Sequence, residues 1–427
     1  MTVDSRLPSR FFTTLAIGGF VLIVVMLTAR AVTRVNQPGV RYPEIDPDTW
    51  ALRDFRDAVY YPVRAIREGV SPYHVQPYVE KYPVGQDFPP YSPLTLVIHL
   101  PFSWMPLQIS QWVYFGLTVA LSFLLAWTIL WIIRFPRSAA SVFGVAAVIL
   151  FSRPGHMNLL LGQTTIPLVL CSLWALQFAK LRPWLSGLCL AMSTFKPTYG
   201  VLLLVLMFAM GHRRAALRGL LITAVITLPL VLWIVALQGG WEESLRIWRE
   251  NSLSLYNNPG RDPAISFSRI DLLALWARWN REALGQSVEL VTTGIIIAAS
   301  CWILTWTNRV SKSTDAFGPS GIFALLVMLI AIYHHAYDAI VLVPILLAAS
   351  SGQSEFWLRW SRFARWTWCG LIAVPLVNYA ATNSFMSTWE VSGLVWKVTT
   401  SLNGAALLVA TVWLAFAMLR QQKNAIA

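Results

Sequence analysis

Charged residues are scarce in this chain of 427 residues. Asp, Glu, Lys and Arg together make up 12% of it, whereas an ordinary soluble domain carries about 25%. Hydrophobic residues make up 56%, and the mean hydropathy is +0.57. Uncharged runs of roughly 15 to 25 residues recur along the sequence, which is typical of helices that cross a bilayer. These features exclude an ordinary soluble domain and predict an all-α protein, a polytopic bundle of transmembrane helices.

Several motifs of soluble enzymes are also missing. The sequence contains no Walker loop, no glycine fingerprint of a dinucleotide-binding fold and no Ser-centred nucleophile elbow. Its four cysteines lie inside apolar runs without paired or metal-type spacing, so neither a disulfide framework nor a zinc site is predicted. We therefore expect no cofactor and no nucleotide substrate.

Apolar runs predict the membrane-spanning helices. They cover 11–31, 109–133, 138–152, 164–179, 183–195, 198–211, 214–237, 288–307, 318–333, 338–350, 366–383 and 398–419. A further run at 91–107 is broken by prolines, and the sequence leaves open whether it crosses. Two long polar segments, 32–90 and 238–287, separate the runs. We predict about 12–13 membrane segments in total.

This pattern indicates a single membrane domain over residues 1–427. Residues 1–31 form a retained first helix rather than a cleavable signal peptide, since the apolar stretch is long and no cleavage site is evident. Residues 91–237 form the membrane core, and 288–427 contribute the C-terminal helices. The segments 32–90 and 238–287 are predicted to be loops on the extracytoplasmic side, the first of them carrying an amphipathic helix.

The basic residues predict the orientation. With a cytoplasmic N-terminus and no crossing at 91–107, sixteen Lys and Arg but only three acids fall on the cytoplasmic side, as the positive-inside rule requires. Both termini are then cytoplasmic, and the net charge of +13 needs no nucleic acid partner. Five polar motifs fall on the outer side, where they can converge on one site: "RDFRDAVYY", "GQDFPPYSP", "GHMNLLLGQTT", "STFKPTYG" and "YHHAYD".

Asp54 and Asp57 are candidates for a general base. They lie three residues apart in a segment that predicts a helix from Asp48 or Thr49, bent or ended near Pro62. The spacing puts both carboxylates on one face. Arginines interleave with them, so the alternative is an amphipathic helix at the bilayer surface whose acids are neutralised. A carboxylate held at the membrane surface is also what the deprotonation of a hydroxyl group requires.

Lys196 stands alone in an uncharged run from Pro183 to Gly211. A lysine at the centre of a spanning helix costs roughly 2.5–3.5 kcal/mol, so either the segment is not at membrane depth or the charge has a partner. The following Pro197 favours a helix break, and broken helices at membrane depth line sites or cavities. Two interpretations remain: the side chain snorkels to the outer headgroups, or its ammonium group binds a phosphate.

Other polar residues are weaker candidates. His334 and His335 lie between two apolar runs, and adjacent helical residues point to different faces, so contact with a phosphate is preferred over a shared metal ion. Gln163 ends an apolar run and also suits the start of a helix. Tyr60 and Tyr61 are candidates for stacking on a sugar, or they belong to an interfacial aromatic belt.

The order of these motifs resembles that of glycosyltransferase family 87, which are membrane transferases with a GT-C type fold that use polyprenyl-phosphate sugars. The similarity runs through "DFRDAVYYPVRAIREGVSPY", "DFPPYSPLTLVIHLPFSWMPL", "LLLGQTTIPLVL", "LSGLCLAMSTFKPTYGVLLL" and "YHHAYDAIVLVPILL". The resemblance implies an inverting, metal-independent transfer of a hexose, commonly mannose. The acceptor would be lipid-linked or a glycan, and the donor lipid-linked.

The resemblance also implies roles for individual residues. An aspartate in the first outer loop would be the base. By position this is Asp57 or Asp54, and we favour Asp57 because it lies two residues before "VYY", although the family spacing is nearer three. Lys196 matches the family's lysine before proline, and His334 or His335 its late histidine, all of them contacts to the donor phosphate.

Asp87, just before "FPPYSP", is a lesser candidate for contact with the acceptor. The resemblance places the active site on the extracytoplasmic face of a bacterial plasma membrane.

Two other classes of function remain open. A transporter or flippase of a lipid-linked or anionic substrate would also use broken helices and buried charges, and a membrane scaffold would need none of these residues.

Overall fold

The computed structural model of the chain describes residues 10–34, 51–256, 262–282, 285–308, 316–352 and 354–426. Within these ranges every regular element is a helix, which confirms the predicted all-α class. The helix expected to begin at Asp48 or Thr49 starts at Arg53 in this part of the chain, and residues 48–50 lie outside the described residues.

Five helices in the described ranges are long and apolar enough to cross a membrane. They are α1 (Arg10–Thr33), α6 (Leu107–Ile132), α12 (Arg213–Leu237), α15 (Gln286–Asn308) and α21 (Gly393–Ile426). A sixth span would be the pair α7 (Ala139–Phe151) and α8 (Arg153–Leu161), which is bent by 76°. The chain is therefore an integral membrane protein.

Shorter helices fill the bundle. They are α9 (Thr165–Phe178), α10 (Pro183–Ser193), α11 (Pro197–Ala209), α14 (Leu272–Asn280), α16 (Pro319–Ala331), η4 (Ala336–Val341), α17 (Leu342–Ser351), α18 (Glu355–Leu358), α19 (Arg362–Val377), η5 (Tyr379–Ala381) and α20 (Asn383–Thr388). Each apolar run predicted to span coincides with a helix. Several of these helices are shorter than the roughly 20 residues that a straight crossing of the bilayer needs. The number of helices long enough to span the membrane alone is therefore smaller than the 12–13 membrane segments predicted.

The proline-broken run at 91–107 forms only short helical pieces. α5 (Leu94–Ile98) and η3 (Leu100–Trp104) contain five residues each. An α-helix of that length rises only about 8 Å. The segment therefore does not form a transmembrane helix of its own.

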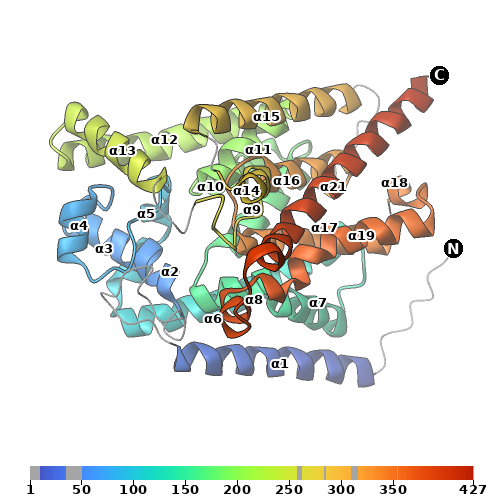
Figure 1. Cartoon of the computed structure of the whole chain (residues 1–427), viewed down its shortest axis with the longest axis horizontal. Helices are drawn as coiled ribbons and strands as arrows, with labels where there is room; N and C mark the ends of the chain where they lie inside the picture. Colours follow the sequence, from blue (N-terminus) through green and yellow to red (C-terminus); the bar gives the residue numbers. More distant parts are fainter. Residues whose placement is uncertain are drawn as a thin grey trace.

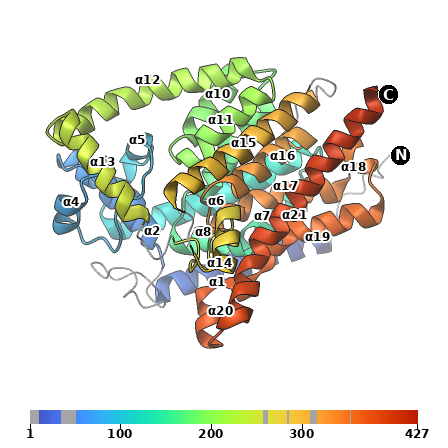
Figure 2. The same ribbon diagram turned by 45° about the horizontal axis from the view of Figure 1, so that its top comes forward.

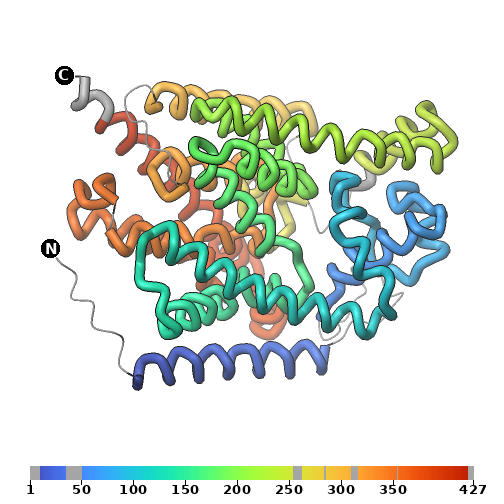
Figure 3. Tube along the Cα trace, turned by 180° about the vertical axis from the view of Figure 1, so that it is seen from behind, coloured from blue at the N-terminus to red at the C-terminus, as the bar shows by residue number. Residues whose placement is uncertain are grey.

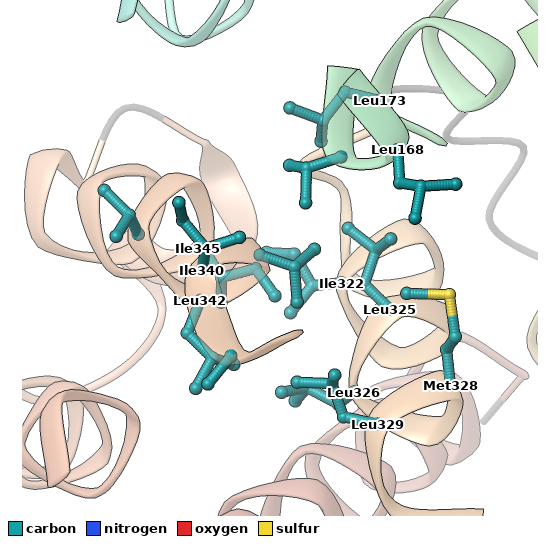
Figure 4. Packing of buried hydrophobic residues seen from close by; sticks show 14 of the residues in the cluster. Leu168, Leu173, Ile322, Leu325, Leu326, Met328, Leu329, Ile340, Leu342 and Ile345 are labelled. Atoms are coloured by element: carbon teal, nitrogen blue, oxygen red, sulfur yellow. The ribbon is translucent and has the colours of Figure 1, made fainter. Parts of the chain in front are cut away.

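The centre of the bundle is α16. Every residue from Gly321 to Ala331 is buried, as expected for a helix that is apolar on all sides. Figure 4 shows its side chains between those of α9 and those of η4 and α17: Leu325 and Met328 lie near Leu168, and Ile322 lies near Ile340.

The helices α1, α12 and α15 lie on the outside of the bundle (Figure 3). Their most apolar stretches are only 11%, 6% and 11% buried. Large apolar side chains such as Leu15 (60% exposed) and Val291 (61% exposed) point away from the protein. Exposed apolar surface of this extent marks contact with lipid.

One end of the bundle carries an N-terminal lobe, residues 51–106 (Figure 1). It contains α2 (Arg53–Phe55), η2 (Arg56–Tyr60), α3 (Tyr61–Arg67), α4 (Val75–Lys81), α5 and η3. α13 (Trp241–Tyr256) packs over this lobe, with Asn251 Nδ2 donating to the carbonyl of Tyr73 at 2.6 Å (Figure 2). α1 begins, and α21 ends, toward the opposite end of the bundle.

Candidate active site

Asp54 lies in α2, where the N-terminal lobe meets the bundle. Leu52 precedes the helix in the left-handed region (φ 56) and donates its backbone N–H to Leu160 O at 2.7 Å, which fixes the helix start against α8. The Asp54 carboxylate accepts hydrogen bonds from Gln86 Nε2 at 3.0 Å and from Gln163 Nε2. Two carboxamides from distant parts of the chain therefore hold one partly exposed carboxylate.

The surroundings of Asp54 make it a stronger base than an exposed aspartate. Burial raises the pKa of Asp54 above its usual value, and the charge of Asp57 acts in the same direction. The charge of Arg53 and the hydrogen bonds from Gln86 and Gln163 oppose this rise. A carboxylate with a raised pKa is better suited to accept a proton from a hydroxyl group.

Asp57 lies in η2 and is fully buried. Arg56 Nε donates to Oδ1 at 2.7 Å, Arg53 Nε lies 3.5 Å from Oδ2, and the Gly85 N–H donates to Oδ2 at 3.1 Å. Gly85 is adjacent to Gln86, so the two aspartates lie on the same side of the helix, as their spacing predicted. Their environments differ, because Asp57 is enclosed by cations whereas Asp54 is partly open.

Lys196 occupies the break between α10 and α11. Its backbone is extended (φ −106, ψ 100) and caps α11, with Pro197 as the first helical residue. The side chain is only 7% exposed, and Nζ lies 2.6 Å from Asp338 Oδ1. The ammonium also lies over the rings of Tyr199 and Tyr337, 5.3 and 5.0 Å from their centroids. Lys196 is therefore a buried cation with a carboxylate partner, not a snorkelling side chain.

Asp338 binds the histidine pair as well as Lys196. Its Oδ2 contacts Nδ1 of His334 at 3.0 Å and accepts the backbone N–H of His335 at 3.1 Å. His334 is fully buried, and its Nε2 has no hydrogen-bond partner among the described residues. One carboxylate therefore organises both the lysine and the histidine that the sequence singled out.

His335 is engaged differently from His334. Its Nδ1 lies 2.6 Å from the Ser268 hydroxyl, and its Nε2 contacts the hydroxyl of Tyr333. Both ring nitrogens therefore have protein partners. Of the two histidines, His334 is the one with a ring nitrogen still available in the described structure.

One loop joins Asp54 to the Lys196 centre. Gln163 Nε2 donates to Asp54, and two residues later the Thr165 hydroxyl donates to Asp338 Oδ1 at 3.3 Å. Two residues of backbone span at most about 7 Å, so one short segment of chain contacts both centres. Asn158 supports this loop, accepting the Thr165 N–H at 3.2 Å. The structure thus brings together all five of the polar motifs, since Gln86 of the second motif also binds Asp54.

The remaining predicted residues lie nearby but are arranged otherwise. Tyr60 and Tyr61 are 3% and 7% exposed and pack edge to face against each other, and the Tyr60 hydroxyl donates to Met105 O at 3.0 Å. Their surroundings point to packing within the N-terminal lobe. Asp87 is half-buried in the loop beside Gln86.

Sequence reasoning assigned no role to Asp338 or to the second long loop. Residues 268–270 of that loop pair with the histidine segment: Ile270 N–H donates to His334 O at 3.0 Å, and Ala336 N–H donates to Ser268 O at 2.7 Å. The signal for Asp338 was an acid at the start of an apolar run, four residues after His334. No sequence pattern marked the pairing of residues 268–270.

Among the residues that the structure describes, no three His, Cys, Asp or Glu side chains group together as a metal site requires. An apolar groove of about 250 Å³ lies beside the site, between the N-terminal lobe and α12. Leu96 and Leu100 line it from one side and Trp233 from the other, with Arg67 at its polar edge. On the opposite side of α5, the Thr95 hydroxyl donates to Phe195 O at 3.1 Å, next to Lys196.

A family model described as Glycosyltransferase family 87 matches residues 88–332, more than half of the chain. The matched region contains Gln163 and Lys196. The segment with Asp54 precedes it, and the histidine pair follows directly after it. No curated protein and no solved structure matches the chain.

Proposed function

Because this chain belongs to glycosyltransferase family 87, we propose that it transfers a hexose from a polyprenyl-phosphate donor to a hydroxyl group of a lipid-linked or glycan acceptor. Mannose is the first sugar to test. The proposal includes inversion at the anomeric carbon, no metal ion, and a site on the extracytoplasmic face of a bacterial plasma membrane.

A single observation carries this proposal. A carboxylate suited to be a base and a buried ammonium suited to bind a phosphate are connected through the loop that contains Gln163 and Thr165. Sugar transfer from a lipid phosphate needs these two groups on either side of the reacting carbon. The base accepts the proton of the attacking hydroxyl, and the cation stabilises the departing phosphate.

We assign the base to Asp54 in preference to Asp57. Asp54 is partly exposed, has a raised pKa and is held by two neutral carboxamides. Asp57 is fully buried against Arg56 and Arg53, which block access to it. In this proposal Asp57 holds the two arginines and the Gly85 loop in place.

The donor phosphate is assigned to Lys196 and His334. An ammonium group has three N–H donors, and one hydrogen bond, to Asp338, is seen for Lys196 Nζ. His334 would contact the phosphate through its Nε2, while its Nδ1 stays in contact with Asp338. In addition α9 and α11 both begin at this site, and the positive ends of helix dipoles favour a phosphate.

The reaction then follows from these positions. The acceptor hydroxyl oxygen attacks the anomeric carbon on the face opposite the phosphate, and its proton passes to the Asp54 carboxylate. The bond between the anomeric carbon and the phosphate oxygen breaks, and its electron pair stays on the phosphate. Lys196 and His334 stabilise that charge. The apolar groove between α5 and α12 would hold the first isoprene units of the donor.

The test supplies membranes containing the protein with labelled polyprenyl-phosphate mannose and follows the label into glycolipid. We expect transfer by the wild type, and a loss of about 100-fold or more for Asp54→Asn, because general bases contribute 10²–10⁴-fold. Asp57→Asn discriminates the two acids: per folded molecule it should transfer far better than Asp54→Asn.

Other outcomes would contradict the proposal. Full transfer by Asp54→Asn would overturn the assignment of the base. Movement of the labelled donor across the membrane by the wild type, with no new glycosidic bond on any acceptor, would identify a flippase instead.

A further inference from the structure

A second cavity lies far from the candidate active site. Its volume is about 580 Å³, and it is lined by residues 130–132 and 134–137 and by Gln177. α9 begins at the site with Thr165, and Gln177 lies in its last turn, about 18 Å along the helix. The lining residues 130–137 lie where α6 turns toward α7, at the end of the bundle opposite the N-terminal lobe (Figure 3).

Aromatic side chains surround this end of α6. The rings of Trp127 and Trp131 are stacked with centroids 6.3 Å apart, and Trp131 contacts the ring of Phe178 at 5.7 Å. The Arg137 guanidinium lies over the Trp127 ring at 5.2 Å, and that of Arg182 over the Phe178 ring at 5.9 Å. Aromatic rings with arginines above them are typical of the headgroup level of a bilayer.

Within the described part of the chain, the arginines at the cavity have no acidic partner. Among the described residues, neither Arg134 nor Arg137 forms an ion pair with a carboxylate, and both side chains are exposed. Arg134 has a left-handed backbone (φ 55), and the Phe135 N–H donates back to Leu130 O at 2.9 Å, so the loop folds over the end of α6. Two uncompensated cations thus flank a hollow that has an aromatic and apolar floor.

We propose that this cavity binds the headgroup of an anionic phospholipid. The phosphate would lie between Arg134 and Arg137, the glycerol against Trp131 and Phe135, and the acyl chains along the exposed face of α6, where Leu124 is 37% exposed. The charge of the lining selects a negative headgroup, and basic pockets between membrane helices are suited to such lipids. This site does not depend on the proposed transfer reaction.

The experiment measures lipids retained by the purified full-length protein with native mass spectrometry. After removal of co-purified lipid, equal amounts of phosphatidylglycerol, which is anionic, and phosphatidylcholine, which is zwitterionic, are added together. We expect at least about fivefold more phosphatidylglycerol adducts on the wild type, and loss of this preference in the double variant Arg134→Gln/Arg137→Gln.

A matched variant, Arg213→Gln/Arg214→Gln, removes the same charge from the same end of the bundle but outside the cavity, and it should keep the preference. Arg134→Lys/Arg137→Lys retains the charge and should keep most of the preference for phosphatidylglycerol. This variant tests the role of the charge if Arg134→Gln/Arg137→Gln does not fold. Equal retention of both lipids by the wild type would overturn the proposal, as would equal loss in both Gln variants. Displacement of the phosphatidylglycerol by glycerol 3-phosphate would identify a site for free phosphate instead.

Discussion

At the scale of single residues, the Asp338 carboxylate is the central group of the candidate site, because its two oxygens bind different partners. Oδ1 of Asp338 takes Lys196 and the Thr165 hydroxyl, and Oδ2 takes His334. A lysine buried in a membrane protein without such a partner would be costly. The pairing removes this cost while ammonium hydrogens remain for a ligand. Lys196 can therefore be stably buried beside Asp338 and still offer hydrogen bonds to an anion.

This arrangement predicts that stability and transfer can be separated. Asp338→Leu alone leaves Lys196 buried and unpaired, and we expect a loss of about 3–5 kcal/mol in unfolding free energy. Adding Lys196→Met removes the stranded charge and should recover most of that loss. Transfer should remain abolished in the double variant, because no ammonium is left for the donor phosphate. Thermal unfolding and transfer assays on the wild type and these two variants check this, and restored transfer in the double variant would rule out a phosphate-binding role for Lys196.

Asp54 predicts a particular pH profile. Its pKa is raised by burial, so transfer should fall on the acid side as the carboxylate becomes protonated, at a pH above the usual aspartate value of about 3.9. The hydrogen bond from Gln163 lowers this pKa. Gln163→Ala should therefore move the acid limb of kcat/KM to higher pH. Gln238→Ala is the control, because it removes a hydrogen bond to Ser71 outside the site, and it should leave the acid limb of kcat/KM where it is. If the acid limb moves in neither variant, the result contradicts the role of Asp54.

At the scale of elements, the site is made by helices that stop short. α8 ends at Gly162, α11 begins after Lys196, and α16 ends before the histidine pair. Each interruption places a polar side chain and backbone groups at a helix end inside the bundle. A regular helix at the same place would present only apolar side chains there. Such breaks are tolerated at membrane depth where they line a site.

The turn at Gly162 is the most constrained of these breaks. Its φ is +73, and an added Cβ would lie 2.6 Å from Phe55 Cβ, in the residue next to Asp54. Gly162→Ala should therefore cost at least about 1–2 kcal/mol and displace α2 from Gln163, which lowers kcat more than it changes donor KM. Gly116→Ala in α6 is the matched control, since nothing lies within 4 Å of its added Cβ. Equal transfer by both variants would show that α2 is not held by this turn.

Helix positions followed from the sequence, but the partners of the polar residues did not. Unbroken apolar runs such as 318–333 predict helices because few other structures satisfy the backbone in lipid, and α16 lies within that range. The spacing of Asp54 and Asp57 predicted a shared side of one helix, but not which of them is enclosed by arginines. The Lys196–Asp338 contact joins residues 142 positions apart, and periodicity carries no information at that separation.

At the scale of the whole molecule, the two ends of the bundle differ in their balance of acidic and basic residues. The N-terminal lobe and α13 carry acids paired with arginines, as in Arg246 with Glu243 and Arg64 with Glu68. The other end carries Arg134, Arg137 and the start of α12, which has no acid in its first turn. This asymmetry is what the positive-inside rule produces when the second end faces the cytoplasm.

The orientation predicts how each end reacts with a reagent that cannot cross the membrane. Arg249 in α13 and Arg214 at the start of α12 are both exposed and lie at opposite ends of the bundle. In intact cells, an impermeant maleimide should label Arg249→Cys but not Arg214→Cys, and permeabilisation should make Arg214→Cys reactive. The chain without either substitution measures the background labelling by maleimide. This background comes from its own four cysteines, which lie within α9, α10, α15 and α19. The reverse pattern would place Asp54 and Lys196 on the cytoplasmic side, where a lipid-linked donor would have to be reached from the other leaflet.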